Sequence, residues 1–153
     1  MAEKRKVHLR GSTQATVDEQ GRLKIPTMFK DILVRSFGDE FFVTSLTGDH
    51  VWVYPLTVWE AHEERLTKTA RLNPHLSKYL YRVNYHGMEV KMDKQGRILI
   101  PATLRDSAAM RGELRVLANI DHLEVWNEER ITKLLASQSF TDEDLSQLAD
   151  LGI

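Results

Sequence analysis

Residues 18–26, DEQGRLKIP, and residues 93–101, DKQGRILIP, repeat one short phrase 75 positions apart. The acidic first residue, the Gln-Gly-Arg step and the Ile-Pro ending are identical in the two copies. The similarity extends on both sides, over residues 15–33 and 90–108. Two copies are too few for a solenoid, which needs three or more stacked repeats. The sequence therefore predicts two related units packed face to face about a pseudo-two-fold axis.

Each copy has the pattern of a strand, a turn, a second strand and a short helix. Apolar residues alternate on both sides of the turn, which has Asp first and Gly fourth, as tight turns prefer. Pro26 and Pro101 lack an N–H group for a sheet, so each should end a strand and open a helix. A further hairpin is expected at residues 40–55 and at residues 113–126. These patterns predict a mixed α+β fold in which short strands dominate.

Longer helices should follow these hairpins. Thr57 and Glu60 have the spacing of a capping box, as do Thr141 and Asp144, and Asn127 is a favourable N-cap residue. The last of these helices carries leucines at helical spacing, at Leu145, Leu148 and Leu151.

The bulk composition is that of a soluble globular protein, with 42% hydrophobic and 28% charged residues in 153. No apolar run approaches the ~20 residues of a membrane span, and the first ten residues lack the pattern of a secretory signal. The chain has no cysteine, which excludes disulfides and thiolate metal ligands. We expect a cytoplasmic protein.

Charge is distributed unevenly along the chain, although the formal net charge is only −1. Residues 1–112 hold 18 Lys and Arg against 13 Asp and Glu, whereas residues 113–153 hold 3 against 9. Local fields govern binding to a polyanion, so the net charge does not exclude a nucleic-acid partner.

Two enzymatic interpretations are weak. Asp18 and Asp93 would be related by the internal two-fold, as in an aspartate-dyad hydrolase, but the residues that follow each Asp do not fit one, and Asp commonly begins a turn. No nucleophile triad, phosphate loop or zinc spacing is present, and the six histidines form no metal-binding pattern. We predict no catalytic residue, no metal and no cofactor.

The duplicated cations are the better candidates for function. Arg22 and Arg97 follow the turn glycines, Lys30 and Arg105 occupy equivalent places in the short helices, and Lys24 lies nearby. A single exposed cation usually serves solubility, and recurrence of one arginine in both copies leaves a binding surface and a solubilising role equally open.

Three segments together resemble the MraZ family of bacterial transcriptional regulators: residues 9–30, 51–66 and 90–105. The hallmark of that family is an Asp-x-x-x-Arg motif in each of two SpoVT-AbrB-like, swapped-hairpin repeats, and both motifs are intact here. The resemblance covers nearly the whole chain. It implies a pseudo-two-fold β-barrel core built from two swapped-hairpin repeats, with flanking helices.

The resemblance also implies a function and partners. Family members bind double-stranded DNA at promoter repeats near a division and cell-wall gene cluster, associate with the nucleoid, and form ring-like homo-oligomers. By this likeness Arg22 and Arg97 are the DNA-contacting candidates, with Lys30, Arg105 and Lys24 as secondary ones. We expect Asp18, Asp93, Gly21 and Gly96 to position these arginines and to shape the turns.

Two features depart from the family pattern. Gln20 and Gln95 stand where the family often has Lys, which removes a possible phosphate contact from each half. The opening residues 1–11 are longer and more basic than usual, and we interpret them as a tail instead of a DNA-reaching arm.

The resulting division places one repeat at residues 10–57 and the other at residues 86–129. A helical connection spans residues 58–85, and C-terminal helices span residues 130–153. We expect the protein neither to associate with a membrane nor to act on a small-molecule substrate. An antitoxin-like swapped-hairpin module is the main alternative; the apolar spacing in the tail is unlike the polar extension of such modules.

Overall fold

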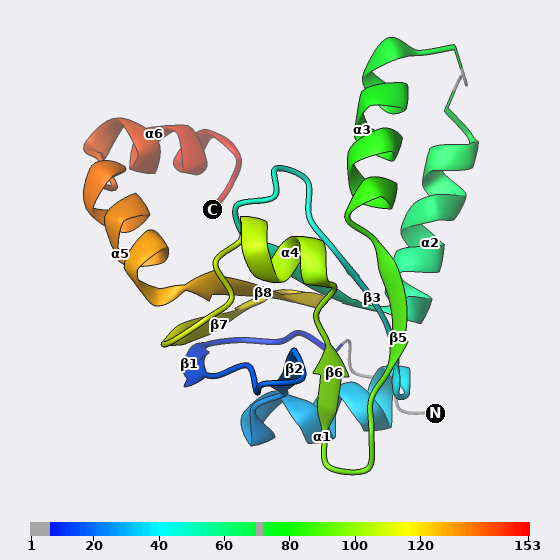
Figure 1. Ribbon diagram of the computed structural model, residues 1–153. Helices are drawn as coiled ribbons and strands as arrows, with labels where there is room; N and C mark the ends of the chain where they lie inside the picture. The colour runs from blue at the N-terminus through cyan, green and yellow to red at the C-terminus, as the bar shows by residue number, and fades with distance from the viewer. Residues whose placement is uncertain (1–6, 70–71) are drawn as a thin grey trace, which may run out of the picture.

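The computed structural model describes residues 7–69 and 72–153 and has a mixed α+β fold (Figure 1). The basic residues 1–6, on which the choice between arm and tail depends, lie outside the described residues. The strands are β1 (Ser12–Ala15), β2 (Arg22–Lys24), β3 (Glu40–Thr44), β4 (Val51–Pro55), β5 (Met88–Lys91), β6 (Arg97–Leu99), β7 (Leu114–Asn119) and β8 (His122–Asn127). The helices are α1 (Thr27–Phe37), α2 (Leu56–Thr67), α3 (Pro74–Tyr85), α4 (Ala102–Ser107), α5 (Glu128–Ser137) and α6 (Asp142–Asp150).

Six strands form one antiparallel sheet in the order β1-β7-β8-β4-β3-β5. The hairpins β3–β4 and β7–β8 are local, but the outer strands are exchanged between the repeats. Strand β1 pairs with β7, so that Ala15 lies opposite Leu114, and β5 pairs with β3, so that Met88 lies opposite Val43. The counterparts in the two repeats are β1 and β5, β3 and β7, and β4 and β8. Replacing each strand by its counterpart gives the same strand order read from the other edge.

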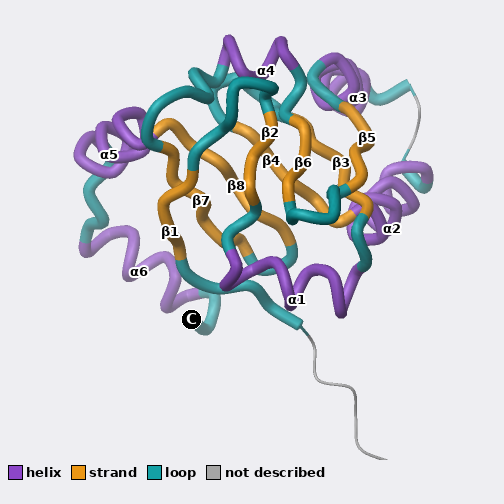
Figure 2. Tube along the Cα trace, turned by 60° about the horizontal axis from the view of Figure 1, so that its bottom comes forward, coloured by secondary structure: helices purple, strands orange, loops and turns teal. Residues whose placement is uncertain are grey.

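The remaining strands, β2 and β6, pair with each other in a separate two-stranded sheet. Leu23 lies opposite Ile98, and both side chains are fully buried beneath this pair. Figure 2 shows β2 and β6 lying across the larger sheet, with α1 and α4 at opposite ends of the pair. Because side chains alternate along a strand, the neighbours of Leu23 and Ile98 face away from the core.

The predicted closed barrel is not confirmed. The six-stranded sheet has β1 and β5 at its edges, and β2 and β6 pair only with each other among the described strands. Two layers bury one core between them instead. That core combines residues of both sheets with the inner faces of α1 and α4, such as Phe29 and Leu104.

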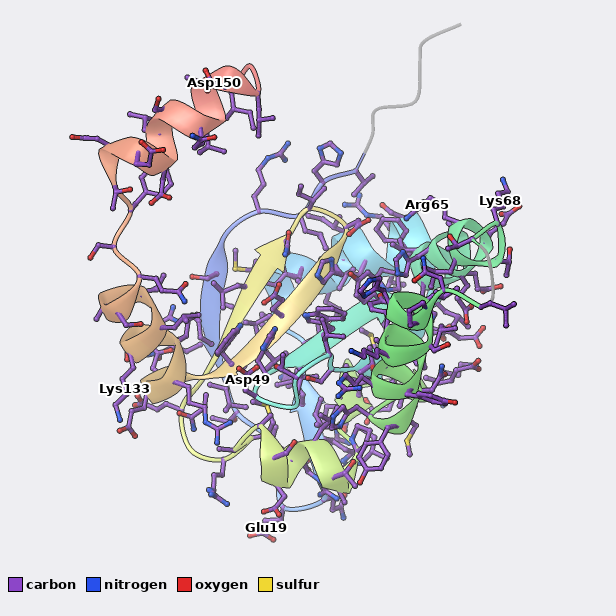
Figure 3. The ribbon with its side chains drawn as sticks, turned by 90° about the horizontal axis from the view of Figure 1, so that it is seen from above. Glu19, Asp49, Arg65, Lys68, Lys133 and Asp150 are labelled. Atoms are coloured by element: carbon purple, nitrogen blue, oxygen red, sulfur yellow. The ribbon has the colours of Figure 1, made fainter. Side chains whose placement is uncertain are left out.

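A second apolar cluster lies on the other face of the larger sheet. Phe42 stacks on Trp59 with ring centroids 4.7 Å apart, and Val83 completes the cluster from α3. Helices α2 and α3 therefore cover the β3 side of this face, whereas α5 and α6 project beyond the β7–β8 side (Figures 1 and 3).

The capping predictions have mixed outcomes. The side chain of Asn127 accepts the N–H of Arg130 at 3.2 Å and caps α5, and Thr141 with Asp144 forms the predicted capping box of α6. The predicted box at Thr57 is wrong. Helix α2 begins directly after Pro55, which leaves Thr57 inside the first turn, where it cannot act as N-cap.

In the part of the chain that the structure describes, no helix has both the length and the apolar character needed to cross a bilayer.

Candidate nucleic-acid interface

The first motif is a tight turn organised by one carboxylate. Oδ1 of Asp18 accepts the backbone N–H of Gln20 at 2.9 Å and that of Arg22 at 3.0 Å. The backbone N–H of Gly21 donates to the carbonyl of Asp18, and Gly21 has φ +81°. This conformation is easy for Gly and strained for other residues, so the turn explains both the Asp and the Gly of the motif.

The second motif reproduces the first one bond for bond. Oδ1 of Asp93 accepts the N–H groups of Gln95 and Arg97, both at 2.9 Å, and Gly96 has φ +79°. The repeated sequence therefore encodes the same hydrogen-bonded turn twice, and each turn delivers one arginine to the start of a strand.

The two motifs meet in a quartet of Asp18, Arg22, Asp93 and Arg97, which we call the motif quartet. Nε of each arginine donates to Oδ2 of its own aspartate, at 3.1 Å for Arg22 and 2.9 Å for Arg97. Nη1 of each arginine lies 3.7–3.9 Å from the aspartate of the other motif. Two turns 75 residues apart in sequence thus hold each other's arginines in place.

A second exchange involves the helix cations. An added Cβ at Gly21 would lie 1.9 Å from Nη1 of Arg105, and one at Gly96 would lie 2.9 Å from Cε of Lys30. Each cation therefore packs against the turn of the other repeat. Figure 3 shows the same relation, because Glu19 at the first turn lies beside α4 of the second repeat. Each glycine leaves room for this close approach in addition to supplying the positive φ angle of its turn.

The predicted cations gather on one face. Arg22, Lys24 and Arg97 alternate with the buried Leu23 and Ile98, and Lys24 lies directly opposite Arg97 in the β2–β6 register. The arginines of the quartet are partly exposed, with 31% and 26% of their side chains accessible. With the two helix cations, five cations and the two motif aspartates lie on or beside the β2–β6 pair.

The two aspartates are suited to orienting arginines and not to acid–base chemistry. The backbone N–H of Arg22 is the main cause that lowers the pKa of Asp18, and the N–H of Arg97 lowers the pKa of Asp93 in the same way. Both carboxylates are therefore ionised at neutral pH. A dyad that shares a proton needs one raised pKa, and this geometry provides none.

The chain is similar in sequence to proteins of one family. The sequence model of a family described as "MraZ protein, putative antitoxin-like" matches residues 8–76 and 85–150. The chain is 41% identical to a protein of Acidobacterium capsulatum over 94% of its length and 99% of that protein, and 40% identical to one of Koribacter versatilis with the same coverage. A relative from Chromobacterium violaceum is 33% identical over 90% of this chain and 93% of its own. All three relatives are named "Transcriptional regulator MraZ".

The chain belongs to the MraZ family.

Two parts of this surface were not predicted from the sequence. One is the pair of cross-motif contacts within the quartet, and the other is the packing of Lys30 and Arg105 against the opposite turns. Neither had a signal in the sequence, because the positive φ angle of each turn already accounts for the recurring glycine.

Two of the six histidines, His50 and His122, belong to a separate cluster on the face of the larger sheet that points away from the main core. His50 and His122, at equivalent positions of the two repeats, direct Nε2 toward Glu124, at 3.3 Å and 3.8 Å. The position equivalent to Glu124 in the first repeat is Trp52, so one carboxylate serves both rings. Within the described residues, no group of three or more acidic or histidine side chains is arranged to hold a metal ion.

The cluster is stabilised by charge and by stacking. His50 stacks on Trp126 and His122 on Tyr54, each with ring centroids 4.1 Å apart. The imidazoles of His122 and His50 hold the pKa of Glu124 well below its usual range, and the side chains of Asn119 and Trp126 donate hydrogen bonds to the same carboxylate. Burial lowers the pKa of His50, but its bonds to Glu124 and Asp49 outweigh burial and leave the pKa raised.

We expect Gly21→Ala to destabilise the fold by more than its backbone strain. A non-glycine residue at positive φ costs about 1–2 kcal/mol, and Gly112→Ala, with φ +69° and open space around the added Cβ, supplies that reference. Gly21→Ala must also displace the guanidinium of Arg105. In urea unfolding, Gly21→Ala should lower the free energy of unfolding by more than Gly112→Ala does. When each substitution is made separately in the Arg105→Ala variant, their costs should become equal. An excess that persists without Arg105 would refute the proposed close contact.

We expect Glu124→Gln to reduce stability in a pH-dependent way. Because the pKa of His50 is raised in the folded protein, its protonated form contributes stability that is fully present below the unfolded value of about 6.5. This contribution is lost as pH rises through the folded pKa. Because the pKa of Glu124 is lowered, its carboxylate contributes stability that is fully present above the unfolded pKa of about 4.3. This contribution is lost as pH falls through the folded pKa. Both contributions coexist between these limits, so the loss should be about 1–3 kcal/mol at pH 6 and smaller at pH 9. Equal losses in urea unfolding at the two pH values would contradict coupling of His50 to Glu124.

Proposed function

We propose that this MraZ-family protein is a sequence-specific, double-stranded DNA-binding regulator of transcription, and that it is not an enzyme. The observation that carries the proposal is the surface on which two identical turns present Arg22 and Arg97 side by side. The relatives named as transcriptional regulators support it. The two repeats, at residues 10–57 and 86–129, would each contribute one motif arginine to a single DNA-binding surface.

The motif quartet prepares both arginines for recognition. A guanidinium has five N–H donors in a fixed fork, and the bond from Nε to the motif aspartate fixes the plane of that fork. The other N–H groups then meet a phosphate or a guanine edge with little further loss of side-chain freedom. A two-stranded β-ribbon also has a width that the major groove admits. The aspartates would therefore act by orienting the arginines.

The neighbouring cations would supply sequence-independent attraction. Lys24, Lys30 and Arg105 border the quartet, so these five cations would attract the phosphate backbone from one face. The contacts of one subunit are too few for tight binding, and repeated operator sites bound by a homo-oligomeric ring would raise the affinity through avidity. We propose as operators the promoter repeats of a division and cell-wall gene cluster that includes the protein's own gene, with the protein in the cytoplasm and associated with the nucleoid.

The test is Arg22→Ala on a duplex taken from upstream of the protein's own gene. In a gel-shift titration we expect apparent affinity to fall at least tenfold, since the lost contact to base or phosphate is charge-assisted and is repeated in every subunit. Lys133→Ala is the matched control, because Lys133 is exposed on α5 and pairs only with Glu129, at 2.9 Å, among the described contacts. The oligomer mass should stay unchanged in both variants.

Asp18→Asn separates positioning from direct contact. It keeps the side-chain size but weakens the hold on Arg22, so affinity should fall although a negative charge near the DNA has been removed. Unchanged binding by Arg22→Ala, or tighter binding by Asp18→Asn, would overturn the assignment of the quartet.

A further inference from the structure

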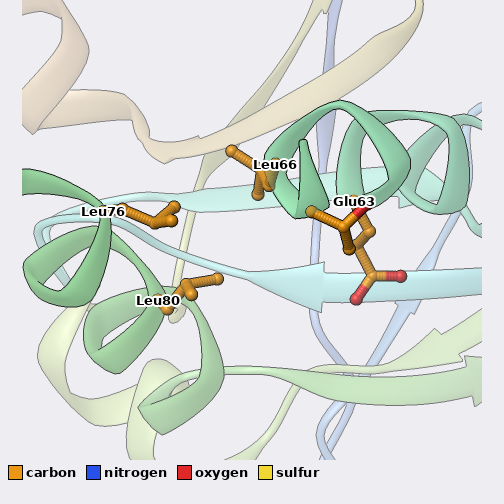
Figure 4. A pocket seen from close by; sticks show the side chains of 5 residues that line it. Glu63, Leu66, Leu76 and Leu80 are labelled. Atoms are coloured by element: carbon orange, nitrogen blue, oxygen red, sulfur yellow. The ribbon is translucent and has the colours of Figure 1, made fainter. Parts of the chain in front are cut away.

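Helix α3 borders two hollows of different chemistry. Toward α2, the side chains of Leu66, Leu76 and Leu80 line an apolar cavity of about 350 Å³, together with Glu63 (Figure 4). A second cavity, of about 620 Å³, lies between α3 and the loop that joins β3 to β4. We call this second cavity the α3 pocket. Its lining, unlike that of the first, is rich in groups that bind anions.

Basic side chains line the α3 pocket along one face of the helix. They are His75, Lys78, Arg82 and His86, and successive members are three or four residues apart. Residues at this spacing are neighbours on a helix surface, so the four side chains form one stripe. With a rise of 1.5 Å per residue, the stripe is roughly 16 Å long, and Lys78 and Arg82 are one turn apart within it.

The positive charge of this stripe has no acidic counterpart in the pocket. Helix α3 contains no Asp or Glu, and none of the described residues that line the pocket is acidic. Lys78 and Arg82 form no ion pair with an acidic side chain in the described parts of the chain, whereas the exposed Lys133 pairs with Glu129 at 2.9 Å. Cations gathered in a concave site attract and concentrate anions.

The pocket also has an apolar wall and an unused polar atom. Leu46 and Tyr79 line it and pack against the second apolar cluster, and the hydroxyl of Tyr79 lies 2.7 Å from Nε2 of His62. Nδ1 of His86 is buried without a hydrogen-bond partner among the described residues. A buried polar atom left unpaired is costly, which favours a bound group that pairs with it. Apolar walls with a few converging polar groups are typical of small-molecule sites of this volume.

We propose that the α3 pocket binds a small phosphorylated ligand of about nucleotide size, with a phosphate group held between Lys78 and Arg82. The guanidinium fork of Arg82 bonds two phosphate oxygens at once, and the ammonium group of Lys78 adds a compact charge one turn away. The uncharged part of the ligand packs against Leu46 and Tyr79.

The phosphate comes from a free small molecule and not from the DNA of the proposed function. The α3 pocket adjoins the second apolar cluster, on the face of the larger sheet opposite the main core. Figure 1 shows α3 above the larger sheet and the β2–β6 pair below it. A duplex bound at the motif quartet therefore faces the other side of the sheet. The proposal does not depend on DNA binding.

The test is isothermal titration calorimetry on the full chain, with inorganic pyrophosphate and ATP as probes. Each should bind once per chain, and adenosine, which has no phosphate, should not bind at the same concentration. The Lys78→Ala, Arg82→Ala double variant should bind both probes at least about tenfold more weakly, because both contacts are charge-assisted. Both side chains are exposed on a helix, where alanine is well tolerated, so the variant should stay folded.

A matched control removes two charges elsewhere. Lys91 and Lys133 are each 74% exposed, and the Lys91→Ala, Lys133→Ala double variant should keep the wild-type affinity for both probes. Urea unfolding of both double variants checks their folding. If the pocket variant unfolds, Arg82→Gln alone replaces it, because it keeps much of the side-chain length and removes the charge; it too should weaken both probes.

The outcomes separate the pocket from the DNA-binding surface. A wild type that binds neither probe at millimolar concentration, adenosine that binds as tightly as ATP, or equal weakening in the two double variants would overturn the pocket. In a gel shift with the upstream duplex, the pocket variant should match wild type; a tenfold loss there would assign Lys78 and Arg82 to the DNA backbone and overturn the small ligand. If both probes bind but the wild type does not shift the duplex, the DNA-binding proposal fails and the pocket stands.

Discussion

The pairing of β2 with β6 is the contact on which the rest of the structure depends. It places Leu23 opposite Ile98, and both are fully buried against the common core. Burying two such side chains favours this register by about 1.5–3 kcal/mol each. A slip of one residue would turn both outward and the arginines inward, which is why the register is strongly specified. The same pairing brings together two turns that are far apart in the sequence.

That pairing joins two ordinary tight turns into one surface that carries both motif arginines. A single Asp-x-x-Gly-Arg turn fixes one arginine through its own aspartate. Side by side, the turns form the motif quartet, in which each aspartate also lies near the arginine of the other motif, at 3.7 Å and 3.9 Å. The glycines leave room for a cation from the opposite repeat. Duplication has therefore produced a surface that neither repeat builds alone.

Local features of the fold were predictable from the sequence, because local chemistry determines them. The Asp and Gly of each turn, the helix after Pro26, and the caps at Asn127 and Thr141 all depend on residues within a few positions of one another. The predicted cap at Thr57 was wrong because the helix already begins after Pro55. Pro55 and Thr57 are both helix-start signals, and the prediction chose the second one. The exchange of outer strands between the repeats could be predicted only from the family resemblance. A strand beside a turn can pair with a neighbouring strand as well as with a distant one, so its own sequence does not decide its partner.

The candidate site was predicted as a set of residues but not as an arrangement. Arg22 and Arg97 were expected to project from the turns, and the structure shows them partly exposed and bonded to the motif aspartates. The crossing of Lys30 and Arg105 depends on the packing of α1 and α4 at opposite ends of the β2–β6 pair, which no local pattern encodes. The barrel core implied by the resemblance is not confirmed, because β1 and β5 form the edges of the six-stranded sheet and β2 and β6 pair with each other among the described strands.

The salt dependence of DNA affinity tests the central claim, that the two motif arginines of each subunit contact DNA together. Each phosphate contact contributes about −0.9 to the slope of log affinity against log salt. If both arginines contact phosphates, the Arg22→Ala, Arg97→Ala double variant should lower that slope by about two per bound subunit. If they read bases instead, the variant should lose discrimination between the upstream duplex and a scrambled one. A double variant with the wild-type slope and undiminished discrimination would contradict the account.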